Sequence, residues 1–552
     1  MPQYQHPGLY IQEIPAIPTI QGASTSIPVF IGLTETGPAN KPMRITSWAT
    51  YTKYFGGLAW GCYTPMAVFE FFAEGGGSAY VVNIDDSGTA PTATNVPISG
   101  WTINPASKGA WSSLIYVAVR DAGPVSAGAK NSNFFSISVM AKVDVVKKQA
   151  DPANTSDPEA LLAAQLLLAY IQNNALKIEP DPTTNDDTTW CTLETFGAFT
   201  AASTLPPQNN PNGAAPIMAQ INAQSLFIRI SAVMQGRPDN TFDATQVPSE
   251  SLGGPDAVTQ VYTAAVPALA AVQDISLVAT PDLVFDVANQ KAVINSLLGT
   301  CEANNLFYII DPPYVADPTD FDTIVTFKSG DPTDQNSIPL ESAYGALYFP
   351  WIQVLNQATN ANLPAPPSGA VAGRYAYTDN SVGVHKAPAG PKDGLMLTVT
   401  GLTSWVTDAA QDALNPHGIN AIRNLAGFGP SIYGARTLAI ASDYTYVPIR
   451  RTISWIERSL RDSLQWVVFE PIGFKLWATV TREVTAFLTS IWRQGALFGG
   501  TADEAFFVTC DGTNNAPEDR AQGLLFVDIG VAPVYPAEFV IIRITQKTSA
   551  AS

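Results

Sequence analysis

The sequence predicts a multidomain protein of the α/β and α+β classes, with a discontinuous core, an inserted outer domain and extended β-arms at both ends. Two observations lead to this prediction. Strand-like apolar runs alternate with helical patterns in residues 23–90, and the alternation resumes after residue 261, which is typical of an α/β core. The segment between them begins with a stretch rich in Thr, Pro and Ser, which indicates a domain boundary and an insertion.

At 552 residues the chain can form several domains, yet only 14% of its residues are charged. Proteins average about 25%, so this composition favours a protein that covers its surface with copies of itself, although an ordinary acidic multidomain protein fits equally well. The net charge of −18 argues against nucleic-acid binding. Four scattered cysteines, a polar start and no long apolar run predict a soluble cytoplasmic chain without direct membrane insertion.

The core elements follow from periodicity and from residues that cap helices. Thr46 or Ser47 precedes a helical pattern that stops at Gly56, and these residue types are preferred at the two ends of a helix. Pro350 interrupts an apolar run and breaks that strand or places it at a sheet edge. Strands are expected at residues 29–33, 79–84, 274–283, 306–311 and 346–354, and helices at 46–56, 65–73 and 286–304. Residues 364–390, rich in proline and glycine, are expected to form a loop.

The inserted segment, residues 91–260, is predicted to be an α+β domain. Asp157 followed by Pro158 is a helix start, and the helix is expected to run to about residue 176. Strands are expected at residues 114–120, 134–140, 143–147 and 225–234, and loops at 179–216. The acidity and loop content of the segment indicate an exposed, outer position.

Residues 415–535 are predicted to form a further domain with two long helices. Apolar residues recur at steps of three and four from Ile449 to Val467, which places them on one helix face, and a second helix is expected at 476–492. Residues 419–500 carry nine basic and five acidic side chains, a local charge of +4. The basic residues on the helices are Arg450, Arg451, Arg458, Arg461, Lys475, Arg482 and Arg493. A solvated helix face and a basic binding surface explain them equally well.

Both chain ends have the pattern of extended strands. In residues 1–22 closely spaced prolines exclude a helix, and Leu9 and Ile11 alternate with Tyr10. In residues 536–552 the alternation of period two is longer and consists of Phe539, Val540, Ile541, Ile542, Arg543 and Ile544. A terminal apolar strand exposes unpaired backbone groups, so we expect a partner strand in the same chain or in a neighbouring one.

The sequence contains no catalytic, cofactor or metal-binding motif that we recognise. Its histidines, His6, His385 and His417, lie in loop-like segments, and no nucleotide-binding, serine-hydrolase or zinc motif occurs. We therefore expect no enzyme, no cofactor and no metal. The alternative is a receptor-binding or glycan-hydrolysing protein with its activity in residues 91–260, where the acidic loop 179–187 is the candidate.

Several motifs together resemble the contractile tail sheath proteins of bacteriophages, tailocins and extracellular contractile injection systems. They are PGLYIQEI, FIGLTETGP, PPSGAVAGRYAYTDNSVGVHKAPAG, NPHGINAIRNLAGFGPSIYGARTL, YVPIRRTISWIERSL, GALFGGTADEAFFVTCD and PAEFVIIRITQ. They follow the order of that family and cover about residues 1–85 and 274–545. The family often has Ala-Arg before the Asp of the third motif, whereas this chain has Tyr377 and Thr378 before Asp379.

The resemblance implies a structural subunit of a contractile sheath, which polymerises helically around an inner tube and contracts to drive the tube through a target cell envelope. Its partners would be copies of itself, the inner tube protein, and baseplate and terminal cap proteins, with no nucleic acid. It would assemble in the bacterial cytoplasm as part of a phage tail or phage-tail-like particle that can be released from the cell.

The resemblance also implies a role for each predicted domain. Residues 23–90 with 261–414 would form the middle domain of the sheath core, and residues 415–535 the inner domain, with the seven basic residues as candidate contacts to the tube. The arms, residues 1–22 and 536–552, would insert into sheets of neighbouring subunits through Leu9, Tyr10, Ile11, Val540, Ile541, Ile542 and Ile544.

Overall fold

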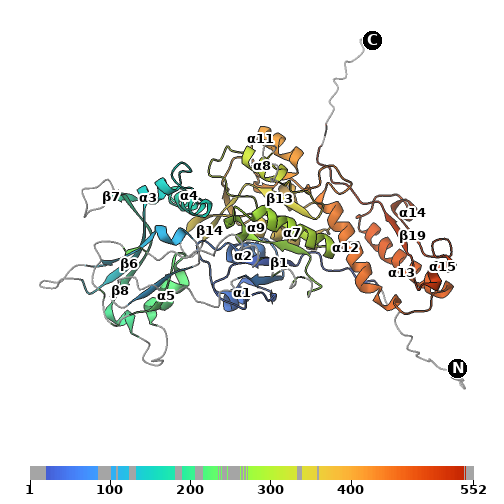
Figure 1. Ribbon diagram of the computed structural model, residues 1–552, viewed down its shortest axis with the longest axis horizontal. Coiled ribbons are helices and arrows are strands. Elements are labelled where there is room, and N and C mark those ends of the chain that lie inside the picture. The colour runs from blue at the N-terminus through green and yellow to red at the C-terminus, as the bar shows by residue number, and fades with distance from the viewer. Residues whose placement is uncertain are drawn as a thin grey trace, which may run out of the picture. The chain divides into compact units, whose positions relative to one another are not determined.

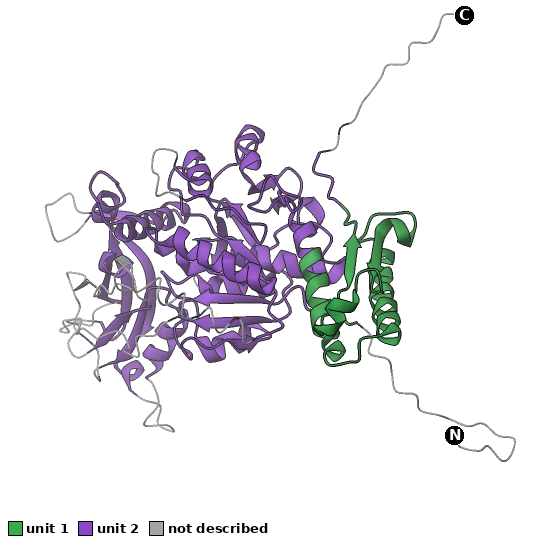
Figure 2. Ribbon diagram, turned by 45° about the vertical axis from the view of Figure 1, so that its right-hand side comes forward, with its two compact units in different colours: residues 1–23, 452–534 green, residues 24–451, 535–552 purple. Residues whose placement is uncertain are grey.

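The computed structural model describes most of the chain, which divides into two compact units (Figure 2). The described residues are 20–84, 101–106, 110–123, 132–180, 189–205, 215–233, 235, 238, 245–246, 262, 265, 269, 272–331, 338–356, 360–539 and 541. Unit 1 comprises residues 1–23 and 452–534, and unit 2 comprises residues 24–451 and 535–552. The arm residues Leu9, Tyr10, Ile11, Val540, Ile542 and Ile544 lie outside the described residues.

Unit 2 is built around an eight-stranded sheet with the strand order β18-β17-β13-β12-β11-β1-β3-β2 (Figure 1). The inner strands run parallel and are β1 (Pro28–Gly32), β3 (Ala79–Asn83), β11 (Leu277–Ala279), β12 (Phe307–Ile310), β13 (Gly345–Phe349) and β17 (Ile419–Leu425). The edge strands, β2 (Met43–Ile45) and β18 (Gly429–Ile432), are antiparallel. Val29 and Ile31 join the hydrophobic cluster on one face and Phe30 joins the other, so both faces of the sheet are covered.

Helices cover the two faces. One cluster contains residues of α1 (Trp48–Phe55), α2 (Thr64–Ala73) and α9 (Ser368–Ser381), and the other contains residues of α7 (Gln290–Asn304), α8 (Asp322–Ser329) and α11 (Asp408–Leu414). The side chain of Ser47 accepts a hydrogen bond from the N–H of Thr50 and so caps α1, which ends at Gly56 with a φ of 88°. The α/β class expected of the core and the expected ends of this helix are confirmed.

The apolar run expected as one strand at 346–354 forms two strands. Pro350 follows β13, and the chain continues as β14 (Ile352–Asn356) in a separate sheet. There β14 pairs with β15 (Ala361–Ala365) and β16 (Val399–Leu402). Proline cannot donate a ladder hydrogen bond, which is consistent with its position between two sheets.

The prediction of a loop at 364–390 is wrong, because the buried helix α9 lies within this range and the short helix α10 (Gly390–Asp393) begins at its last residue. Glycine lowers helix propensity, but here it lets α9 approach α2 closely. A Cβ atom on Gly369 would lie 2.3 Å from Cα of Ala67, and one on Gly373 would lie 2.5 Å from Cβ of Glu74. The glycines that suggested a loop are therefore required by helix packing.

The inserted segment is of mixed α and β structure and belongs to unit 2. Its five-stranded sheet has the order β10-β5-β6-β8-β7 and comprises β5 (Ile115–Asp121), β6 (Phe135–Lys142), β7 (Ile178–Pro180), β8 (Thr189–Phe199) and β10 (Thr245–Gln246). A second pair joins β4 (Thr102–Pro105) to β9 (Ile228–Ala232). The helices are α3 (Val143–Gln149), α4 (Pro158–Asn173) and α5 (Pro216–Gln224), and Asp157 caps α4 as expected.

Two expectations for the insert are wrong. Residues 143–147 form helix α3 rather than a strand, because Val143 and Val146, three residues apart, are both buried while Val145 is 36% exposed. The stretch 179–216, expected to be loop-rich, contains the 11-residue strand β8, which pairs with β6, a strand whose residues are buried up to Ala141. In both places packing against a neighbouring element outweighs the secondary-structure preference of the local sequence.

Unit 1 contains the long helix α13 (Phe474–Arg493) and the part of α12 (Val447–Ser463) that follows Arg451. Its other elements are α14 (Ala502–Ala505), α15 (Pro517–Ala521) and the antiparallel pair β19 (Phe506–Thr509) and β20 (Asp528–Val531). Ile456, Val480 and Val484 belong to its hydrophobic cluster. The second segment of this unit covers residues 452–534, and the preceding strands β17 and β18 belong to the large sheet of unit 2.

Candidate functional site

Three of the seven basic residues expected to face a tube are buried. Arg450, Arg451 and Arg458 are 4%, 4% and 6% exposed. A guanidinium enclosed in its own subunit cannot line a surface that meets another protein, so this conformation assigns the three arginines an internal role. For Arg451 the sequence could not show this, because its ion-pair partner Asp379 lies 72 residues away along the chain.

Arg451 forms a buried ion pair with Asp379 of α9. Its Nη1 lies 3.0 Å from Asp379 Oδ1 and its Nη2 lies 2.6 Å from Oδ2, and the two side chains are 3% and 1% exposed. The same Nη2 donates to the carbonyl of Thr25 at 2.9 Å, and the guanidinium lies 4.6 Å from the ring centre of Tyr375. This bidentate pair joins three distant segments of unit 2.

Arg450, the preceding residue, lies between two aromatic rings. Its guanidinium carbon is 4.7 Å from the ring centre of Tyr344 and 4.5 Å from that of Tyr444. Both distances fall within the range of cation–π attraction. The start of α12 is therefore fixed in unit 2 by two adjacent arginines.

The other four basic residues are exposed. They are Arg461 on α12 and Lys475, Arg482 and Arg493 on α13. The three on α13 are spaced by seven and eleven residues, close to two and three helical turns, so they lie along one face of the helix. We call these three residues the basic stripe.

The root of the C-terminal arm is held by a single carboxylate. Glu538 accepts hydrogen bonds from Arg436 Nη2 at 2.7 Å and Nε at 3.0 Å, from Asn415 Nδ2 at 2.9 Å and from the hydroxyl of Tyr446 at 3.0 Å. Burial raises the pKa of Glu538, but these hydrogen bonds outweigh burial and hold the pKa below its ordinary value. Beyond it, Phe539 and Ile541 are 72% and 80% exposed. The arm is thus fixed in unit 2 just before its apolar part begins.

The root of the N-terminal arm is held in unit 1 along one face of α12. The N–H of Gln21 donates to Ser463 Oγ at 3.1 Å, and the N–H of Ala23 donates to Ser459 Oγ at 2.9 Å. Trp455 Nε1 donates to the carbonyl of Ala23 at 2.9 Å. The three side chains on α12 are four residues apart, which aligns them on one face. The apolar spacing of this helix predicted its buried face, but no pattern in the sequence pointed to these polar partners.

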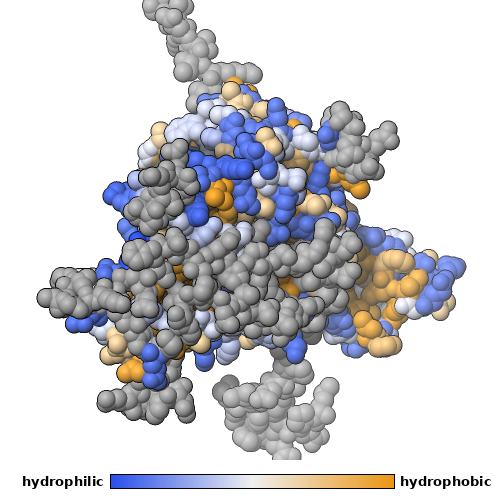
Figure 3. Space-filling view, turned by 60° about the vertical axis from the view of Figure 1, so that its left-hand side comes forward, coloured by the Kyte–Doolittle hydropathy of each residue, from blue (hydrophilic) through white to orange (hydrophobic). Residues whose placement is uncertain are grey.

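Unit 1 also presents a small sheet and many exposed aromatic rings. Within the described residues β19 and β20 pair only with each other as strands. The exposed rings are Phe469 before α13, Phe474 at the start of α13, Phe498 after α13 and Phe507 in β19, which are 102%, 84%, 72% and 59% exposed. In Figure 3 hydrophobic surface is gathered at the right-hand side of the view. Exposed apolar groups of this extent are typical of surfaces that bind another protein.

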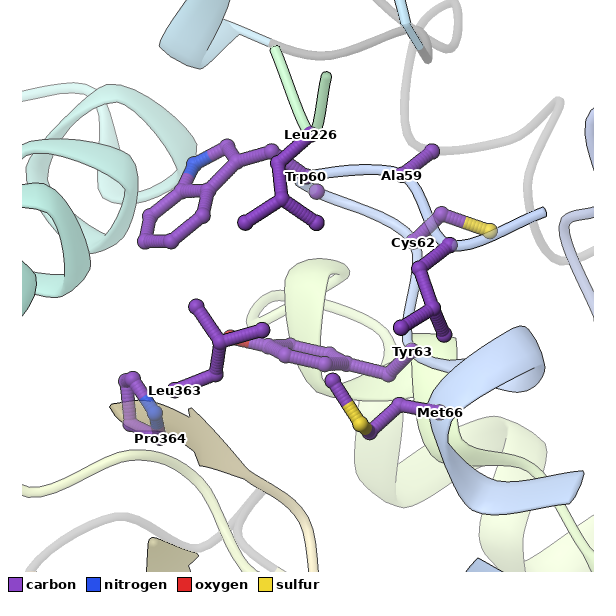
Figure 4. A pocket seen from close by; sticks show the side chains of 10 residues that line it. Ala59, Trp60, Cys62, Tyr63, Met66, Leu226, Leu363 and Pro364 are labelled. Carbon is purple, nitrogen blue, oxygen red and sulfur yellow. The ribbon is translucent and has the colours of Figure 1, made fainter. Parts of the chain in front are cut away.

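A cavity of unit 2 lies where the insert meets the core (Figure 4). Its apolar lining includes Trp60, Met66, Leu226 and Leu363, and its volume is about 20 Å³. That volume holds little more than one water molecule, so the cavity does not fit a glycan or another substrate. The N–H of Trp60 donates to the carbonyl of Leu226 at 2.7 Å, which connects core and insert directly.

Metal-binding side chains are not clustered in the part of the chain that the structure describes. There, no three His, Cys, Asp or Glu side chains are placed to hold a metal ion. His417 contacts Ser329 and His385 lies near Asp379, whereas His6 is outside the described residues. No described helix is both long and apolar enough to cross a membrane.

The fold is that of contractile sheath subunits. The chain superimposes on a subunit of the extracellular contractile injection system PVC sheath in its contracted state with a TM-score of 0.54 and 20% identity, covering 99% of both chains. It superimposes on the contracted helical sheath of the anti-feeding prophage with a TM-score of 0.51 and 21% identity, covering 99% of this chain and all of the other. The expected fold class is therefore confirmed.

Sequence comparisons agree with the structural likeness. Residues 441–547 match the phage tail sheath C-terminal domain family. The chain is 24% identical to the tail sheath protein of Vibrio phage KVP40 over 53% of its length, and 25% identical to a putative prophage major tail sheath protein of Pseudomonas aeruginosa over 45%. The matches span 41% and 60% of those relatives' own lengths. The expected resemblance to contractile tail sheath proteins is thus confirmed.

Proposed function

We propose that this chain is the structural subunit of a contractile sheath, which polymerises helically around an inner tube and contracts to drive that tube through a target cell envelope. The observation that carries the proposal is the match of residues 441–547 to the tail sheath C-terminal domain. This region contains the basic stripe, the small sheet and most of the C-terminal arm. The relatives of the chain are named as tail sheath proteins, which supports a role without enzyme activity.

The arms are the proposed connectors between copies. The apolar residues Phe539 and Ile541 are exposed directly after the anchored Glu538, as expected for a segment that binds elsewhere. The β19–β20 pair in unit 1 is a suitable acceptor, because an added strand would satisfy backbone groups at a sheet edge. A strand that forms about five ladder hydrogen bonds contributes several kcal/mol at about 0.5–1.5 kcal/mol each.

The basic stripe and Arg461 are the proposed contacts to the inner tube. Exposed charges give weak contacts that salt screens, which suits a sheath that must release its tube during contraction. If the stripe binds the tube, replacing Lys475, Arg482 and Arg493 by Ser should weaken tube binding and reduce its dependence on ionic strength. Replacing two exposed acids, Asp503 of α14 and Glu518 of α15, is a control.

Baseplate and terminal cap proteins are the further proposed partners, in a particle assembled in the bacterial cytoplasm. The alternative, a receptor-binding or glycan-hydrolysing insert, gains no support from the described residues. Glu179 is paired with Lys177 at the surface, and the rest of the acidic loop, 181–187, lies outside the described residues.

Electron microscopy of the purified chain tests the proposal. The full chain should form helical cylinders or sheath-like rings, with or without the tube protein. Deleting residues 539–552, which leaves the Glu538 anchor in place, should give a folded monomer. Normal cylinders from that variant would refute the role of the arm, and a full chain that never polymerises would refute the sheath function.

A further inference from the structure

Two buried carboxyl groups of unit 2 meet at one hydroxyl group. Glu70 and Glu74, one helical turn apart at the end of α2, are each 1% exposed. The hydroxyl of Thr398, just before β16, contacts Glu70 Oε2 and lies 2.6 Å from Glu74 Oε1. The N–H of Thr398 also donates to Glu74 Oε1 at 2.7 Å. The two carboxyl groups therefore join α2 to the chain that leads into β16.

Counting hydrogen atoms shows which group carries a proton. A threonine hydroxyl donates a single hydrogen bond, so Thr398 cannot serve two ionised carboxylates at once. Glu74 has other donors, namely the N–H of Thr398 and the guanidinium of Arg374, whose Nη1 is 3.8 Å from Glu74 Oε2. Glu70 has none, because its Oε1 accepts no hydrogen bond from the described residues. All the contacts are satisfied when a protonated Glu70 donates to the Thr398 hydroxyl and that hydroxyl donates to an ionised Glu74.

The surroundings of Glu70 favour its neutral form. Burial raises the pKa of Glu70 to about 8, a hydrogen bond donated by Thr398 to the ionised form opposes the rise, and the charge of Glu74 adds to it. Arg374 does not contact Glu70, since its Nε and Nη2 donate to the carbonyl of Asp393. Among the described residues, the other titratable groups on the surrounding elements contact neither carboxyl; they are Tyr51 and Lys53 of α1, Asp282 of η3 (Pro281–Phe285), Tyr375, Tyr377 and Asp379 of α9, and Lys392 and the carboxylate of Asp393 of α10.

Thr398 ends a short segment that lies along an edge strand. The N–H of Met396 donates to the carbonyl of Pro430 at 2.9 Å, and the N–H of Ile432 donates to the carbonyl of Gly394 at 2.8 Å. Both bonds lie along β18, the last strand of the large sheet. The segment from Gly394 to Thr398 is thus held by backbone hydrogen bonds to β18 and by the carboxyl pair of α2.

We propose that the proton shared between Glu70, Thr398 and Glu74 is a pH-sensitive switch, which holds the segment from Gly394 to Thr398 in place and releases it as the pH rises. Without that proton, two ionised carboxylates one turn apart repel each other and compete for one hydroxyl hydrogen. Opening would uncover the backbone groups of an edge strand. This inference goes beyond the proposed sheath function and does not depend on it.

Infrared spectra of the full-length chain test the proton. A protonated carboxyl group has a C=O stretching band that a carboxylate lacks. The difference between the parent chain and Glu70→Gln at pH 6 should contain this band, and the band should fade as the pH is raised through about 8. Glu302→Gln, an exposed position on α7, is the control and should remove carboxylate absorption only. A Glu70→Gln difference spectrum without the acid band would overturn the proposal.

Hydrogen exchange of the same chains tests the release. Between pH 6 and 8 the protection factor of a peptide covering residues 394–402, corrected for intrinsic exchange, should fall by up to about tenfold per pH unit, because the open form releases the proton that the closed form keeps. In Glu70→Gln, whose amide can still donate to Thr398, protection should stay nearly constant. A peptide from α4 is the internal control. An equal fall in α4, or the same fall in Glu70→Gln, would refute a local switch at this pair.

Discussion

Asp379→Ala should destabilise the protein far more than any substitution of an exposed basic residue. Asp379 and Arg451 are 1% and 3% exposed at the side chain, and the replacement leaves the guanidinium buried without its charge partner. Removing one partner of a buried ion pair costs about 3–5 kcal/mol. This is a large part of a total stability of about 5–15 kcal/mol, so we expect a much lower urea midpoint and a lower yield of folded protein.

The assay is urea unfolding of the parent chain and five variants, followed by tryptophan fluorescence and circular dichroism. Arg451→Met and Asp379→Leu should each be destabilised about as strongly as Asp379→Ala. The combined Asp379→Leu/Arg451→Met chain should lose less than the sum of the single changes, because an apolar pair of similar volume leaves no buried charge. Arg461→Ala, an exposed arginine of the same helix, is the control and should change stability by no more than about 0.5 kcal/mol.

The opposite outcome would assign Arg451 to the tube surface. If Arg451→Met were as stable as Arg461→Ala but no longer bound the inner tube, the internal role argued from burial would be refuted. A double variant as unstable as the sum of the single ones would show that the two residues act independently.

Three further outcomes follow from the structure. Burial raises the pKa of Glu70 to about 8, against the opposing hydrogen bond from Thr398, so the folded state retains a proton that the unfolded chain releases above its ordinary pKa. The contribution of Glu70 to the free energy of unfolding should therefore be full below about pH 4.5 and should decline towards pH 8, by up to about 1.4 kcal/mol per pH unit. The urea midpoint of Glu70→Gln should depend less on pH than that of the parent chain. Gly369→Val should destabilise by at least about 1–3 kcal/mol because its Cβ would meet the backbone of Ala67. Gly299→Ala, on α7 with open space around it, should instead stabilise by about 0.5–1 kcal/mol, and thermal unfolding of both variants measures the two changes. Glu538→Ala should leave the core folded but make the chain near residue 538 more sensitive to limited proteolysis, since four hydrogen bonds that fix the arm are lost. Unchanged proteolysis would contradict the anchoring role.

Much of the core could be predicted because local signals agree with the tertiary surroundings. Ser47 and Gly56 are good helix ends in any context, and α1 begins and ends beside them. The apolar run at 29–33 suits a strand buried on both faces, and β1 occupies that position. The two long helices near the C-terminus were predicted for the same reason, since their apolar spacing matches the face that each one buries.

The remaining elements depend on partners that the local sequence does not reveal. Gly369 and Gly373 suggest a loop until α2 is placed against them. Val143, Val145 and Val146 favour a strand, but the buried pair spaced by three positions belongs to a helix. The candidate site shows the same limit, because Arg451 looks like any other basic residue of an amphipathic helix until Asp379, 72 residues away, is brought to it.

The hydrogen bonds that hold the start of each arm suggest how tension applied to the arms would be transmitted through one subunit. The N-terminal root is held in unit 1, by Ser459 and Ser463, whereas the C-terminal root is held in unit 2, by Arg436. If neighbouring copies hold both arms, as proposed, tension between them must cross from one unit to the other. The helix α12 continues across that boundary, and Arg451 is the last residue of the helix that belongs to unit 2. A buried ion pair at this point would keep the helix fixed in unit 2 under load, which gives a mechanical reason for an arginine that never reaches the surface.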